Sequence, residues 1–129
     1  MMKDIILMRV GFFETAADVS AAATSGERPS EELAARYLEQ GEVVVAAMQW
    51  VDDLLDADSK NICQYSIRTD GVWVWPDSLA YYVRKYHVQL PVEFLSRMES
   101  NDWTVGALED AVVDVICERL ADELSEAGQ

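Results

Sequence analysis

Carboxylates are the most frequent side chains able to do chemistry in this chain, with 24 Asp and Glu among 129 residues. A close pair of carboxylates can act as general acid and general base. With 24 present, close pairs are expected by chance, so their number identifies no site. The one histidine, His87, lies at an expected helix end, where we interpret it as structural. Because the chain has no GxSxG, HExxH, phosphate-binding loop or GxGxxG motif, we predict that it is not an enzyme.

A dense acidic cluster consists of Asp52, Asp53, Asp56 and Asp58. A calcium-binding EF-hand loop has Gly at its sixth position and Glu at its twelfth. Counted from Asp52, those positions hold Ala57 and Cys63, so the pattern fails. We predict no metal and no cofactor here. We interpret the cluster as a surface loop and, alternatively, as a partner-binding site.

A second acidic series recurs every four residues near the C-terminus: Asp110, Asp114, Glu118, Asp122 and Glu126. On a helix, like charges at this spacing repel by about 0.2–0.5 kcal/mol per pair, and acids near its C-terminal end oppose the helix dipole. An apolar stripe at the same spacing predicts a long helix over residues 105–124: Leu108, Val112, Ile116, Leu120 and Leu124. The acidic face has two interpretations, a surface for a basic partner or an ordinary solvated face.

Aromatic residues are concentrated in one short segment: Trp73, Trp75, Tyr81, Tyr82 and Tyr86. Trp and Tyr are favoured anchors of protein interfaces, so Trp73 and Trp75 are candidate partner-binding residues. The alternative is that these rings fill the seam between a sheet and a helix. The two cysteines, Cys63 and Cys117, lack the spacing of a zinc site, and we expect buried thiols, while a disulfide between them stays open.

The net charge of −14 at pH 7 restricts the possible partners. Such a charge repels nucleic acids and anionic membranes, whereas it attracts basic proteins and accelerates their association. Alternatively, it serves only solubility. The apolar run over residues 5–8 is too short for a signal peptide or a membrane span, so we expect a cytoplasmic protein.

A hairpin is the clearest local signal. Residues 62–68 and 72–75 flank Thr69-Asp70-Gly71, and Asp-Gly favours a type I′ turn. That turn pairs Thr69 with Val72 and Arg68 with Trp73. The register places two sets on opposite faces: Cys63, Tyr65, Ile67, Val72 and Val74 on one, and Gln64, Ser66, Arg68, Trp73 and Trp75 on the other.

The remaining segments predict mostly helices. We expect a strand over residues 5–13, a loop over 16–30 with a helical turn near 19–23, and a helix from the N-cap Ser30 to Gly41. Residues 43–55 fit either a strand or a helix, and we favour the strand because the hairpin needs a pairing partner. Helices follow Pro76 and Pro91. The fold class is therefore α+β: one domain over 1–129, in which a small antiparallel sheet is covered on one face by four to five helices.

One block of sequence is similar to a known group of proteins. It runs from Thr69-Asp70-Gly71-Val72-Trp73-Val74-Trp75-Pro76 through Tyr81-Tyr82-Val83 to Leu90-Pro91-Val92-Glu93-Phe94. Together with Tyr37-Leu38-Glu39-Gln40-Gly41, it resembles small bacterial proteins with the pattern TDGxWxWPxxLxYYVxxYxVxLPxEF. Those proteins resemble immunity proteins of polymorphic or contact-dependent toxin systems. The resemblance covers about 60 residues and implies no catalytic residue.

We therefore expect an immunity-type protein that uses an acidic surface to bind and neutralise a basic partner, a cognate toxin. A nuclease toxin must be basic to hold its substrate, so an acidic inhibitor can associate with it rapidly. A second hypothesis is a module that self-associates, for example as a homodimer, through its Trp and Tyr residues. A third is an enzyme with a carboxylate-based site.

Overall fold

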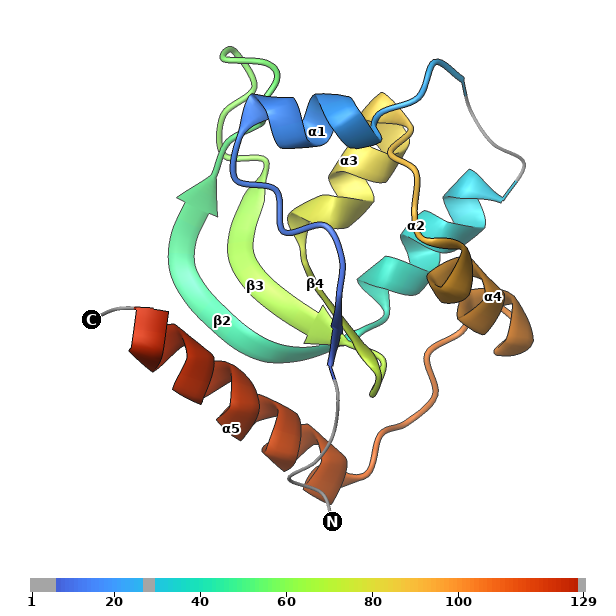
Figure 1. The fold of residues 1–129 in the computed structure, drawn as a ribbon, viewed down its shortest axis with the longest axis vertical. Coiled ribbons are helices and arrows are strands. Elements are labelled where there is room, and N and C mark those ends of the chain that lie inside the picture. The colour runs from blue at the N-terminus through green and yellow to red at the C-terminus, as the bar shows by residue number, and fades with distance from the viewer. Residues whose placement is uncertain (1–6, 27–29, 128–129) are drawn as a thin grey trace.

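The computed structural model describes residues 7–26 and 30–127, and these form an α+β fold. The elements, in chain order, are β1 (Met8–Arg9), α1 (Ala16–Ala22), α2 (Glu31–Glu39), β2 (Glu42–Val51), β3 (Cys63–Thr69), β4 (Trp73–Pro76), α3 (Ser78–Tyr86), α4 (Val92–Ser100) and α5 (Asp110–Ala127). The strands form one four-stranded sheet, and α5 crosses below its curved strands (Figure 1). The predicted fold class is confirmed.

The sheet has the order β1-β4-β3-β2, so β1 and β2 are its edges. The strands β2, β3 and β4 are antiparallel, as predicted, but β1 runs parallel to β4. The sheet is therefore mixed rather than antiparallel. A parallel pair needs a long connection, and the chain between β1 and β4 supplies one through α1, α2 and two strands.

The ambiguous segment after α2 is the strand β2, which ends at Val51, so the prediction of a strand was correct over most of its length. Three other predicted bounds were wrong. The segment predicted as a loop with a helical turn near residues 19–23 contains the longer helix α1. At its start the Thr15 side chain accepts the Asp18 N–H, while Asp18 accepts the Thr15 N–H. The strand expected over 5–13 is only β1, although residues 5 and 6 lie outside the description. The last helix starts at Asp110 rather than near residue 105.

The hairpin between β3 and β4 has a wider turn than predicted. Thr69 pairs with Val74 and Arg68 with Trp75, a shift of two residues from the predicted register. Gly71 has a φ of 100°, but Asp70 is not among the described residues with positive φ, so the turn is not type I′. The Asp70 carboxylate instead accepts the backbone N–H groups of Val72 and Trp73, at 3.0 and 2.8 Å. Because the shift is even, the predicted division of side chains between the two faces still holds.

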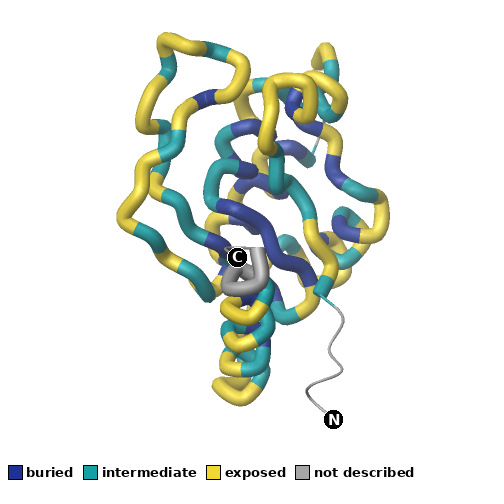
Figure 2. Tube along the Cα trace, turned by 60° about the vertical axis from the view of Figure 1, so that its left-hand side comes forward, coloured by how far each residue is buried: buried dark blue, intermediate teal, exposed yellow. Residues whose placement is uncertain are grey.

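Each face of the sheet packs against its own helices, so the expectation that helices cover one face was wrong. Trp73 and Trp75 lie in a core with residues of α2, α3 and α4. Ile67 and Val74, on the opposite face, lie in a smaller core with Ile116 and Leu120 of α5. The buried segments gather at the centre of the molecule, between exposed outer loops (Figure 2). The sheet is thus sandwiched, with α5 alone on one side.

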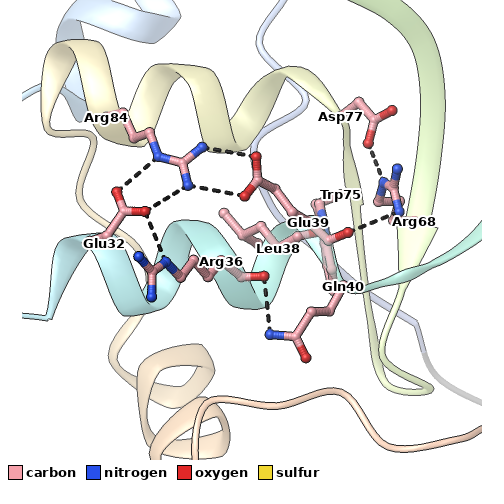
Figure 3. A network of polar contacts seen from close by, with 9 residues as sticks. All are labelled: Glu32, Arg36, Leu38, Glu39, Gln40, Arg68, Trp75, Asp77 and Arg84. Atoms are coloured by element: carbon pink, nitrogen blue, oxygen red, sulfur yellow. Dashed lines mark hydrogen bonds and ion pairs between the residues drawn. The ribbon is translucent and has the colours of Figure 1, made fainter.

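A polar network ties α2 to α3 and to the sheet (Figure 3). The Arg84 guanidinium of α3 bridges Glu32 and Glu39 of α2, with nitrogen–oxygen distances of 2.9–3.0 Å. Arg68 of β3 pairs with Asp77 and donates to the carbonyl oxygens of Glu39 and Gly41. Gly41 is required there by space, because a Cβ would lie 2.6 Å from Cζ2 of Trp75.

Candidate functional site

The two tryptophans predicted as partner anchors lie in the core. Trp73 is 5% exposed and Trp75 is 0% exposed. The Trp73 ring stacks on Phe94 with centroids 4.6 Å apart, and Trp75 Nε1 donates to the Leu38 carbonyl at 3.0 Å. The prediction that Trp73 and Trp75 bind a partner was therefore wrong. Their aromatic area is already buried against helices, which was the alternative interpretation.

Asp53, in the loop between β2 and β3, is a buried structural residue. Its side chain is fully buried and accepts hydrogen bonds from Tyr81 and Tyr86, both at 2.7 Å, and from Lys85 at 3.1 Å. It also accepts the N–H of Leu55 at 2.7 Å. Burial by itself raises the pKa of Asp53, but these hydrogen bonds, led by those from Tyr81 and Tyr86, lower it to about 2. Asp53 is thus unavailable to a partner, contrary to the predicted role.

The rest of this acidic loop is partly neutralised from within. Asp56 accepts a hydrogen bond from Ser59 at 2.8 Å and pairs with Lys85 at 3.3 Å. Asp52 accepts the Asn61 N–H at 2.9 Å. Asp58 is exposed and contributes a backbone N–H to Asp56. The side chains of Asp52, Asp56 and Asp58 are at least partly exposed, whereas Asp53 is buried. Asp53 and Asp56 tie the loop to Lys85 of α3.

The acidic face of α5 differs from that loop. Asp110, Asp114, Glu118 and Asp122 are all exposed, and none of them forms an ion pair in the described part of the chain. On the opposite side of the helix, Ile116 and Leu120 are buried, as the apolar stripe predicted. The side chains of Leu124 and Glu126 lie outside the description.

A fifth carboxylate, that of Glu42 at the start of β2, extends the acidic face. Burial raises the pKa of the Cys117 thiol, and the negative charges of Asp114 and Glu42 raise it further. Both carboxylates therefore lie near that thiol, where α5 packs on β2. Sequence reasoning missed Glu42 because its proximity to α5 depends on tertiary packing. We call Glu42, Asp110, Asp114, Glu118 and Asp122 the acidic face.

Seven positively charged residues of the described chain pair with carboxylates outside the acidic face. Ion pairs with carboxylates are formed by Arg9, Arg36, Lys60, Arg68, Arg84, Lys85 and Arg97. Arg119, on α5 itself, also takes part in an interaction. Most of these cations join separate elements, as Arg97 does when it binds the buried Asp70 at 2.8 Å. The excess of acid is therefore concentrated on surfaces such as the acidic face.

A hollow of about 460 Å³ lies between the segment after β1, the far ends of β2 and β3, and the start of α3. Five aromatic residues line it: Phe12, Phe13, Trp50, Tyr65 and Tyr82. The ionisable acids in its lining are Glu14, Asp52 and Asp77, and its described lining contains no Lys, Arg or His. We call this hollow the aromatic cleft. It was not foreseen, because its walls come from segments far apart in sequence.

Histidine and cysteine side chains often act in catalysis, but His87, Cys63 and Cys117 have structural roles in this fold. His87 ends α3 in a left-handed conformation with a φ of 54°, and its Nδ1 lies 2.7 Å from Glu31. Cys63 and Cys117 are both free thiols. Burial, with a smaller effect of Asp77, raises the pKa of Cys63 to about 11, so it is a protonated, weak nucleophile at neutral pH. Among the described residues, no group of His, Cys, Asp and Glu is arranged to hold a metal ion.

Comparison with protein families, with curated proteins and with solved structures found no match to this chain. None of the helices in the described part of the chain has both the length and the apolar character that a membrane crossing requires.

Proposed function

We propose that this protein is an immunity-type protein that binds and neutralises a basic protein, a cognate bacterial toxin, through the acidic face. One observation carries this proposal: the carboxylates of the acidic face are exposed and form no ion pairs in the described chain, whereas most of the cations that form ion pairs there join other elements. The toxin as partner comes from the resemblance of the segment around Thr69–Phe94 to immunity proteins.

The physical basis is electrostatic attraction that acts before contact. A net charge of −14 attracts a basic protein from a distance, and the ordered row on α5 gives the attraction a direction. A toxin that acts on nucleic acid carries a basic substrate groove, because phosphates must be neutralised there. A row of carboxylates occupies such a groove in place of the phosphates and so blocks the substrate.

The test uses the product of the neighbouring toxin gene and measures association rate and affinity at several salt concentrations. One variant neutralises the acidic row on α5: Asp110→Asn, Asp114→Asn, Glu118→Gln and Asp122→Asn. A matched control removes the same number of charges from exposed acids elsewhere: Asp58→Asn, Glu93→Gln, Glu99→Gln and Asp102→Asn. Both variants therefore have the same net charge.

We expect the α5 variant to associate at least about tenfold more slowly at low salt, and the control by less than about threefold. Wild-type binding should weaken as salt rises, because salt screens exposed charges. Equal effects of the two variants, or affinity independent of salt, would contradict the role of the acidic face. Absence of binding to the neighbouring toxin would remove the immunity function altogether.

Self-association is a second candidate, and it depends on a different surface. The edge strand β2 exposes Val43, Met48 and Trp50, with Met48 95% exposed. An exposed, apolar edge strand can pair with a second copy. Light scattering over a range of protein concentrations tests this directly. A mass that stays monomeric at all concentrations would rule it out.

A further inference from the structure

The aromatic cleft has the composition of a site for an organic cation. At about 460 Å³ it lies within the usual size range of ligand pockets. The faces of aromatic rings carry negative electrostatic potential and attract ammonium and guanidinium groups. The carboxylates of Glu14, Asp52 and Asp77 add to this potential, and the described lining offers an anion no positive side chain.

The walls of the cleft are held in place before any ligand binds. The Tyr82 ring is 2% exposed, its hydroxyl accepts the Leu54 N–H at 3.0 Å, and the ring meets Phe13 edge to face with centroids 5.6 Å apart. Trp50 is 55% exposed, so its ring forms a wall accessible to a ligand. A fixed inner wall and an accessible outer ring suit a side chain that enters from solvent.

The three acids of the cleft differ in how far neighbouring residues already neutralise their charge. Asp77 pairs with Arg68, and Asp52 accepts the Asn61 N–H and lies 4.0 Å from Lys60. Glu14 is exposed and forms no ion pair in the described part of the chain. A cationic group that enters the cleft therefore finds an unneutralised carboxylate at Glu14.

We propose that the aromatic cleft binds the side chain of an arginine or lysine of the basic partner. This inference rests on the proposed function, because it assigns the occupant to the same partner that the acidic face attracts. Aromatic walls pack against the methylene stem while the carboxylates and ring faces bind the charged end. Glu42 of the acidic face begins β2 and Trp50 of the cleft lies near its other end, and a strand of ten residues spans at most about 33 Å.

The test uses small probes in place of the partner. N-acetyl-arginine amide is titrated into the isotope-labelled protein, and the indole N–H resonance of Trp50 is followed by NMR. N-acetyl-citrulline amide is the matched neutral probe, because it has nearly the same shape without the charge. We expect a saturable shift with the arginine probe and binding at least about tenfold weaker with the citrulline probe.

Two variants locate the binding. Trp50→Leu and Glu14→Gln should each weaken the arginine probe by about fivefold or more. The control, Met48→Leu, changes an exposed residue of the same strand outside the cleft and should bind the probe as the wild type does. Thermal melting of each variant establishes that it is folded. Equal binding of the two probes, or equal effects of Trp50→Leu and Met48→Leu, would overturn the proposal.

The outcome is separable from that of the proposed function. The variant that neutralises α5 should still bind the arginine probe, because its substitutions lie outside the cleft. If the probe fails while toxin binding remains salt-dependent, the cleft assignment is wrong and the immunity function stands. If the probe binds while no toxin does, the cleft remains a cation site and the immunity function is wrong. Spermidine binding about tenfold tighter than the arginine probe would point to a free polyamine and overturn the partner as occupant.

Discussion

The loop over residues 52–58 and the helix α5 are both rich in acid, but the central carboxylate of the loop is buried, whereas those of the helix are exposed. In the loop, Asp53 is fully buried and accepts hydrogen bonds from two tyrosines, a lysine and backbone N–H groups. On α5, the four carboxylates of the acidic face are exposed and form no ion pairs in the described chain. Each segment supplies four of the predicted partner-binding carboxylates, but their structural roles differ.

The element that lies opposite each cluster accounts for this difference. The helix α3 presents Tyr81, Lys85 and Tyr86 toward the loop, and Lys85 also lies 5.4 Å from the centroids of both tyrosine rings. The four acids on the outer face of α5 form no ion pair in the described chain, and the sheet packs against the other side of this helix. Acid opposed by donors stabilises the fold, whereas acid facing solvent is free to act on a partner.

The largest expected difference between the two regions is in stability. Asp53→Asn should lower the free energy of unfolding by about 2–4 kcal/mol, because it removes a buried charge from Lys85 and disturbs several hydrogen bonds. The matched change Asp114→Asn on α5 should alter it by less than about 0.5 kcal/mol. Urea unfolding at neutral pH measures both. Equal effects would mean that the two clusters do not differ in their structural roles.

A second prediction concerns acid. The pKa of Asp53 falls from 3.8 to about 2 on folding, so ionised Asp53 favours the folded state. This stabilisation, about 2 kcal/mol, is fully present above pH ~4 and is lost as the pH falls through 2. The wild type should therefore lose more stability between pH ~5 and ~2 than Asp53→Asn. Unfolding free energies measured across that range check this, and parallel curves for the two proteins would contradict it.

Patterns local in sequence predicted much of this fold. The alternation in β3 and β4 assigned Trp73 and Ile67 to opposite faces, and the four-residue spacing on α5 identified its buried side. The turn register could not be predicted, because it depends on contacts between the Asp70 carboxylate and residues distant in sequence. Its carboxylate binds Tyr37 and Arg97, from distant helices, and those contacts favour the wider turn. The capping box of α1, Thr15 with Asp18, is a local pattern that predicts the start of this helix.

The candidate sites were less predictable, for a physical reason. Whether Asp53 faces solvent depends on tyrosines 28 and 33 residues away, and no local pattern contains that information. The aromatic cleft likewise combines Phe13, Trp50 and Tyr82 from three segments. By contrast, the α5 acids lie on one helix, so their common exposure followed from helical periodicity alone.

The smallest expected effect gives the sharpest test of the acidic face. Asp114→Lys replaces two repulsions, with Asp110 and Glu118, by two attractions at helical spacing, so it should stabilise the protein by about 0.5–1 kcal/mol at low salt. The gain should shrink at high salt, because these charges are exposed. The same substitution should weaken binding to the basic partner. The control Asp58→Lys, in the loop, should change both properties little.

If Asp114→Lys raises stability and weakens binding, the acid is kept on α5 for the partner at a loss of stability. A stabilised protein with unchanged binding would instead make the row an ordinary solvated face.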